Sequence, residues 1–376
     1  MSASLIPLRA ALAVADLLDN CARVQRDQHV LLLCGVDGLH GGRNLIDEQA
    51  IGWIQSGIQQ RGAHASVLWT DMPLHPDVYW SRTSDAVPAW DLPPIVKGAM
   101  ASADLVINHL IDYWTEGELR ERVPNYFYNM ATTAPLLTSA WALTPWELVA
   151  EIRVRSAAMV NPGAEWRITH PNGTDVRGTV ALQLMPHYGE LRYGPFPEGV
   201  FPSTATVGAE GTLVFDQNGP HWARHIGLPL RYSQPVRMTI EQGRVKEIRG
   251  GPEAEIFRDF FKALSRHLGD RAYEMRGFHG GAHPYARVSE SECPDPWYRA
   301  FIEHHGAHSV HFHIGNSHLT PEYPFNVHVS AELQGATVQV GENVIYRDGR
   351  LTAFDDPQVR AIAARYPDRP GVDPGW

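Results

Sequence analysis

Apolar runs and helical spacings alternate through the first part of the chain. Residues 29–34 form a continuous apolar run between turn residues, which is typical of a strand buried on both faces of a parallel sheet. The two patterns predict strands at 29–34, 65–69 and 104–108, and helices at 5–24, 45–60 and 94–103. Strands that alternate with helices over short connections predict a parallel α/β domain of Rossmann-like type over residues 1–150.

The pattern changes after Arg153, where short strands follow one another with turn signals between them. Asn172-Gly173 separates two alternating stretches, and this dipeptide is a strong local signal for a β-hairpin. Further strands are predicted at 211–215, 236–240, 245–249, 336–340 and 344–347, and helices at 145–153, 252–267 and 358–365. This mixture predicts an α+β domain over residues 151–376, so the fold class is α/β with two domains.

Composition favours an ordinary globular protein that acts on a small molecule. The chain has 376 residues, of which 44% are hydrophobic and 20% charged, and its net charge is −10. This acidity argues against nucleic acid or an anionic membrane surface as the main partner. The first 20 residues lack the basic start of a signal peptide and the long apolar run of a membrane span. We therefore expect a small-molecule substrate, no nucleic-acid or membrane partner, and a homo-oligomer.

Cysteine and glycine patterns narrow the possibilities further. The three cysteines, Cys21, Cys34 and Cys293, are widely spaced and form no disulfide framework, so a reducing, cytoplasmic location is expected. The glycine-rich loop at 38–42 departs from GxGxxG, and no GK[ST] follows it. We therefore predict no nucleotide cofactor.

Histidine carries the strongest chemical signal in the chain. Of its 19 histidines, ten lie between His267 and His328. Residues 309–314 alternate in the manner of a strand, so His311 and His313 should point to one face. Residues 325–330 alternate again and carry His328, which predicts a second strand beside the first. Histidine is the commonest metal ligand, but CxxC and HExxH patterns are absent, so the spacing alone names no metal.

Four stretches of the chain, at residues 15–32, 60–64, 200–214 and 240–251, carry a resemblance to known proteins. They resemble the thermophilic aminopeptidase family of metallopeptidases and its relatives, the 2,5-dihydroxypyridine 5,6-dioxygenases. The last stretch is more similar to the pyridine dioxygenases than to the peptidases. The resemblance therefore implies a metal-dependent enzyme that acts on a small molecule.

The metal ligands of these families can be carried over one by one. In the peptidase motif His-x-x-x-Gly-x-x-Tyr the histidine binds metal; His311 matches it here, and His318 stands at the tyrosine position. Both families carry His-x-Asp in the following strand, where this chain has His328 and then Ser330 in place of the carboxylate. A further ligand, glutamate or histidine in the two families, should fall near Glu274. The resemblance thus implies His311, His328 and Glu274 as metal ligands.

Three enzyme-type functions remain open at this stage, beside the alternative that the protein is not an enzyme. The first is a ring-opening dioxygenase acting on a hydroxylated N-heteroaromatic, with Fe(II) held by those ligands and positions open for substrate and O₂. The second is a metallohydrolase that cleaves an amide bond with Zn(II) or another divalent ion, with Glu303 as base. The third is a relative that has lost its metal and uses the histidines as acids and bases. We name Glu303, His313 and His318 as candidate catalytic residues.

Overall fold

The structure is a computed structural model that describes residues 6–35, 46–70, 93–109, 126–182, 196–197, 204–218, 228–315 and 329–375. Four parallel strands form its first sheet, in the order β2-β1-β3-β4. They are β1 (His29–Gly35), β2 (His64–Thr70), β3 (Leu105–Asn108) and β4 (Tyr126–Tyr128). β1 is central and is buried from Val30 onward because strands flank it on both sides. The parallel sheet predicted for the first part of the chain is confirmed.

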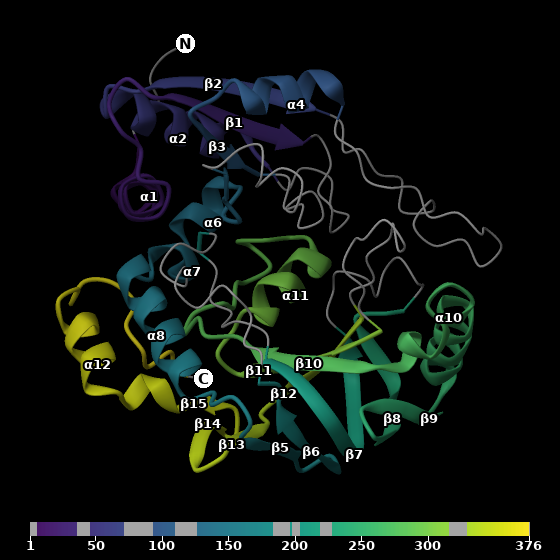
Figure 1. Ribbon diagram of the computed structural model, residues 1–376. Helices are drawn as coiled ribbons and strands as arrows, with labels where there is room; N and C mark the ends of the chain where they lie inside the picture. Colours follow the sequence, from purple (N-terminus) through teal and green to yellow (C-terminus); the bar gives the residue numbers. More distant parts are fainter. Residues whose placement is uncertain are drawn as a thin grey trace.

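Helices α1 (Leu8–Ala15), α2 (Glu48–Gln60) and α4 (Pro94–Ala101) and the π-helix η1 (Asp16–Cys21) accompany this sheet at one end of the molecule (Figure 1). The helices α6 (Ala134–Thr138), α7 (Ala140–Leu143) and α8 (Trp146–Ala158) follow in the chain and lead from this sheet toward the second one. The Asp47 carboxylate caps α2 by accepting from the Ala50 amide at 2.6 Å. It also accepts from the Ala134 amide at 2.7 Å, so one side chain fixes the starts of two helices.

The segment predicted as a single α-helix at 5–24 has a different helix type in its second part. The chain forms α1 and then widens into the π-helix η1. The widening begins at Asp16, whose buried carboxylate accepts from the Trp146 amide at 3.3 Å and pairs with Arg369. These long-range partners attach the turn to the rest of the fold, and sequence spacing within the segment cannot reveal them.

Eleven antiparallel strands form the second sheet, in the order β10-β11-β12-β7-β6-β5-β13-β14-β15, with β8 between β7 and β9. In chain order its first five strands are β5 (Glu165–His170), β6 (Thr174–Val180), β7 (Thr204–Asn218), β8 (Arg231–Glu241) and β9 (Arg244–Arg249). The later ones are β10 (Met275–Gly280), β11 (Ser309–Ile314), β12 (Val329–Gln334), β13 (Thr337–Val340), β14 (Asn343–Arg347) and β15 (Arg350–Leu351). β7 pairs with β10 near its start and with β12 near its end, so it holds the β10-β11-β12 segment from both sides.

The remaining helices are α10 (Pro252–Leu268), the 3₁₀-helix η3 (Gly269–Tyr273), α11 (Pro296–His304), the 3₁₀-helix η4 (Thr352–Asp355) and α12 (Pro357–Ala364). The predicted hairpin at Asn172-Gly173 is confirmed, because β5 and β6 pair around Gly173 with its positive φ of 99°. The strand predicted at 325–330 is confirmed at its last two residues, where β12 (Val329–Gln334) begins, and residues 325–328 lie outside the described residues. Within the described ranges no helix has the length and apolar character needed to cross a membrane.

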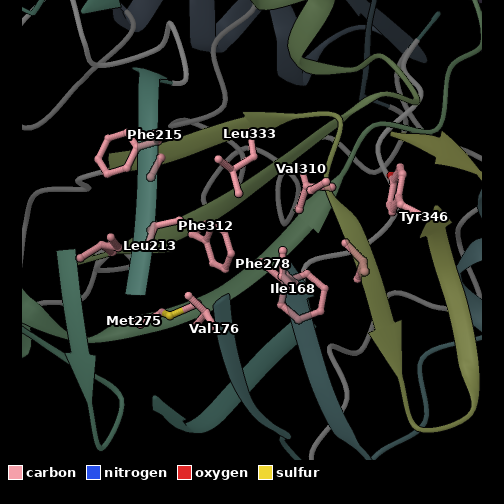
Figure 2. Packing of buried hydrophobic residues seen from close by; sticks show 14 of the residues in the cluster. Ile168, Val176, Leu213, Phe215, Met275, Phe278, Val310, Phe312, Leu333 and Tyr346 are labelled. Carbon is pink, nitrogen blue, oxygen red and sulfur yellow. The ribbon is translucent and has the colours of Figure 1, made fainter. Parts of the chain in front are cut away.

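The main hydrophobic core lies against one face of the β10-β11-β12 segment (Figure 2). Phe278 of β10 faces Phe312 of β11 in register, and Phe312 faces Ala331 of β12. All three are at most 1% exposed. Because side chains alternate along a strand, the neighbours of these residues must point to the opposite face.

Helix α11 connects the second sheet to the core of the first. Its residues Tyr298, Phe301 and Ile302 are fully buried in the cluster that also contains the β1 side chains. The Tyr298 hydroxyl donates to the Met130 carbonyl, which lies 168 positions earlier in the chain. Figure 1 shows α11 between the two sheets. The first core is therefore completed by a helix from the second half of the chain, and the division into domains at residue 150 stays a prediction.

Replacing Phe312 with alanine tests the packing beneath β11. The ring is fully buried beside Phe278 and Val310, so its removal leaves a cavity and should lower the free energy of unfolding by about 3–5 kcal/mol. Urea denaturation followed by circular dichroism measures the change. Gln339→Ala, at an exposed position of β13, is the control and should stay within about 0.5 kcal/mol of wild type. A loss below about 1 kcal/mol for Phe312→Ala would contradict the packing.

Candidate metal centre

The strands β10, β11 and β12 present polar side chains on the face opposite the core. In register, His311 lies between His279 of β10 and Glu332 of β12. His313, two residues along β11, lies opposite Ser330. These five side chains share one face because they occupy alternate positions of adjacent strands. The antiparallel ladder therefore gathers side chains that are up to 53 residues apart in the sequence.

The three histidines of this face, His279, His311 and His313, bring their Nε2 atoms together. The Nε2 atom of His279 lies 2.5 Å from that of His311 and 2.8 Å from that of His313. The ligand atoms of all three lie within 4.8 Å of one another. His311 is fully buried and His313 is 8% exposed, while His279 is partly buried. The three rings thus form a compact, nitrogen-lined site largely shielded from water.

A metal ion fits this arrangement better than hydrogen bonds do. The Nε2 atom of a neutral imidazole carries either a proton or a lone pair, so His279 cannot form ordinary in-plane hydrogen bonds to both neighbours through one nitrogen. Imidazole nitrogens bind first-row metals at about 2.0–2.1 Å, and two such ligands at right angles lie about 2.9 Å apart. The separations of 2.5 and 2.8 Å are close to that value. The three nitrogens are therefore close enough to serve as ligands of one metal ion.

A buried carboxylate, that of Glu332, lies next to this site on the neighbouring strand β12. Glu332 is 3% exposed and accepts from the Ser309 hydroxyl at 2.8 Å and the Gln217 amide at 3.3 Å. Its other oxygen lies 2.9 Å from Nδ1 of His304. The His304 ring in turn lies against that of His311, with centroids 3.7 Å apart and planes tilted by 31°. The His304 ring therefore links the Glu332 carboxylate to the three-histidine site.

Glu303 lies beside this layer, on α11. Burial raises the pKa of its carboxyl above the usual value, the Arg287 guanidinium opposes this shift, and the negative charge of Glu332 adds to it. The Arg287 Nε lies 3.8 Å from the Glu303 carboxylate. A raised pKa suits a carboxyl group that exchanges protons near neutral pH.

Two further buried histidines, His283 and His305, are held in neutral form near the site. Burial lowers the pKa of His283 to about 3 and that of His305 well below its usual range, with His304 adding to the second shift. Nδ1 of His305 lies 2.7 Å from the Phe301 carbonyl, so it must carry the proton of that ring. Nδ1 of His283 accepts from the Tyr285 amide at 3.0 Å. These hydrogen bonds fix the tautomers of both rings.

The structure brings some of the predicted site residues together. The predicted ligand His311 lies beside His313, a predicted catalytic residue that the strand pattern had placed on the same face. Glu274 instead pairs with Arg276 at 2.9 Å and with Arg244 at 3.7 Å, and it is not among the described ligand atoms that converge with His311. His318 and His328 lie outside the described residues, so their roles stay predictions.

Sequence reasoning missed two residues of the site. His279 lies a few positions beyond the segment around Glu274 where the further ligand was expected. Glu332 lies two residues after Ser330, on the same face of the same strand, where a carboxylate was noted as missing. The period of two along β10 and β12 is a signal that could have found both, once the strand boundaries were known.

Comparisons with known proteins bear on the fold and the family. The model of the NicX family, described as 2,5-dihydroxypyridine 5,6-dioxygenase, matches residues 48–353. A solved structure of 2,5-dihydroxypyridine dioxygenase from Pseudomonas putida KT2440 is similar with a TM-score of 0.62 and 15% identity, covering 91% of this chain and 96% of that one. Wild-type AmpT from Thermus thermophilus is similar with a TM-score of 0.50 and 12% identity, covering 91% of this chain and 98% of that one. A search of curated proteins finds no match. The resemblance seen in the sequence is confirmed.

Acidification should destabilise the fold through His283. Its folded pKa of about 3 lies below the ordinary value of 6.5, so the unfolded chain takes up a proton first as the pH falls. The stability due to the neutral ring is present above pH 6.5 and is lost toward pH 3. Between pH 7 and pH 5 this residue should cost about 2 kcal/mol of unfolding free energy.

The variant His283→Asn removes this titration while keeping a side chain that can accept from the Tyr285 amide. Urea denaturation at pH 7, 6 and 5 should show a shallower loss of stability for His283→Asn than for wild type. His64→Gln, at an exposed position of β2, serves as the control. Identical pH dependence in His283→Asn and wild type would show that the ring does not titrate in this way.

Proposed function

Since the chain belongs to the 2,5-dihydroxypyridine 5,6-dioxygenase family of enzymes, we propose that it is a metal-dependent dioxygenase that opens the ring of a small hydroxylated N-heteroaromatic. The observation that supports this most directly is the convergence of three imidazole Nε2 atoms at a largely buried point. Three protein ligands on one side of a metal leave positions free for substrate and O₂. The reaction would insert both atoms of O₂ and break one bond between adjacent ring carbons.

We propose His279, His311 and His313 as the residues that hold the metal. The sequence-predicted ligands His328 and Glu274 remain alternatives to be tested beside them. Iron in the Fe(II) state is the proposed ion, because imidazole ligands suit it and it can exchange electrons with O₂ and substrate when bound. Zn(II) would occupy the same nitrogens but would supply no electron, so the metal's identity separates a dioxygenase from a hydrolase.

The chain's own groups would position the substrate and move its protons. A hydroxylated heteroaromatic loses a phenolic proton when its oxygen meets a cation, and Glu303 is the proposed acceptor because its pKa is raised by burial. Arg287 lies beside it and would attract an anionic substrate toward the site. His318 remains a proposed catalytic residue from its place in the histidine-rich segment. The buried surroundings of His311 exclude water from the ligand nitrogens.

Oxygen uptake tests this function. Protein loaded anaerobically with Fe(II) should consume one O₂ per ring opened when 2,5-dihydroxypyridine is supplied, because both oxygen atoms enter the product. An oxygen electrode combined with the loss of the ring's ultraviolet absorbance measures both quantities. Zn(II)-loaded protein is the control and should consume none. Cleavage of an aminoacyl chromogenic amide with no O₂ uptake on any hydroxypyridine would favour the hydrolase instead.

Substitution of single histidines tests the ligand set. His279→Ala and His311→Ala should each bind Fe(II) at least tenfold more weakly, because a three-nitrogen site loses one of its bonds. Fe(II) content after anaerobic gel filtration measures the loss, and circular dichroism checks the fold. His64→Ala is the matched histidine control from the first sheet. Full metal content in His279→Ala, with loss in His311→Ala, would point to His311 with His328 and Glu274 as the ligands, and full content in both variants would overturn both ligand sets.

A further inference from the structure

The three ligands proposed above for the metal are all neutral, so they do not balance the positive charge of the ion. Imidazoles that bind a metal do so without charge, so His279, His311 and His313 leave a divalent ion with its full positive charge. The position opposite His313 on β12 is Ser330, whose side chain is 1% exposed and carries no charge. A divalent ion in a buried site needs nearby negative charge.

Glu332 is a buried carboxylate next to this site that has no lysine or arginine among its described hydrogen-bond partners. A buried carboxylate is costly unless it is paired with a cation, and Glu332 is only 3% exposed. Its hydrogen-bond partners within the described residues are Gln217, Ser309 and His304, so none is a lysine or an arginine. The side chain lies directly opposite His311 on the neighbouring strand. Among these described hydrogen-bond partners, only the His304 imidazole can carry a positive charge, and an ion held by His311 would place a second one beside the carboxylate.

We propose that Glu332 is the charge-balancing carboxylate of the metal centre and acts through His304 from outside the ligand set. The carboxylate accepts from Nδ1 of His304 and so fixes both the tautomer and the plane of that ring. The His304 ring lies 3.7 Å from the ring of His311, centroid to centroid, and therefore fixes the orientation of a ligand. Glu332 and His304 are thus positioning residues. The inference rests on the proposed function only in requiring a metal at the three histidines.

The experiment compares binding of Co(II) alone by wild type and by Glu332→Gln. Glutamine keeps the size and a hydrogen-bonding oxygen but removes the charge. The Co(II) dissociation constant should rise about 10- to 100-fold, as is usual when an outer partner of a ligand is lost. The visible absorption of bound Co(II) should also change, because the His311 ring is less firmly oriented. A purely structural role for Glu332 would instead lower the thermal midpoint of the metal-free protein and leave the Co(II) spectrum unchanged.

Two further variants sharpen the comparison. Glu253→Gln is the matched control, since Glu253 is also a buried carboxylate that accepts from a serine, the Ser233 hydroxyl at 3.0 Å, but it belongs to α10. It should leave Co(II) binding within twofold of wild type. His304→Gln can still donate to Glu332 but removes the ring beside His311, so its Co(II) spectrum should change as well. It keeps the test decisive if Glu332→Gln does not fold.

The outcomes separate this inference from the proposed function. Wild-type Co(II) affinity and spectrum in both Glu332→Gln and His304→Gln would overturn the inference and leave the dioxygenase proposal standing. Weaker Co(II) binding in Glu332→Gln, with no O₂ uptake by the Fe(II) form of wild type, would support the inference and overturn the dioxygenase. A wild-type protein that binds no Co(II) would overturn both.

Discussion

The site depends on one structural constraint, the alternation of side chains across the antiparallel ladder of β10, β11 and β12. Phe278 and Phe312 on one face enter the main core, so the register cannot slip by one residue without exposing them. The same register forces His279 and His311 to lie side by side on the other face. Hydrophobic burial on one side of the segment therefore determines the chemistry on the other.

Electrostatics explains how so many imidazoles can share a small volume. Burial keeps His283 and His305 neutral, and hydrogen bonds to backbone groups fix their tautomers. The three rings that converge through Nε2 are compatible at close range when a cation lies between their lone pairs. Glu332 adds a buried carboxyl group beside them, through its contact with His304. The three ligand atoms are close enough to hold one metal ion, and the membership of a dioxygenase family gives this arrangement a chemical context.

Helix α11 links the site to the rest of the molecule. Its inner residues Tyr298 and Phe301 complete the core around the parallel sheet, while His304 at its end lies against His311. The position of His304 over the strands therefore depends on packing contributed by the first half of the chain. Changes in that core, far from the histidines in sequence, can be expected to alter the geometry of the site.

The sequence by itself determined the local elements and the family, because these depend on short-range patterns. The apolar run at 29–34, the turn at Gly173 and the alternation at 309–314 each predict a structure from neighbouring residues alone. Only the tertiary structure decided which polar residues meet. His279 and Glu332 belong to different strands from His311, and strand register is set by burial across the whole sheet. Glu274 is the opposite case, a residue that the sequence placed in the site. In the structure its carboxylate pairs with Arg244 and Arg276 instead.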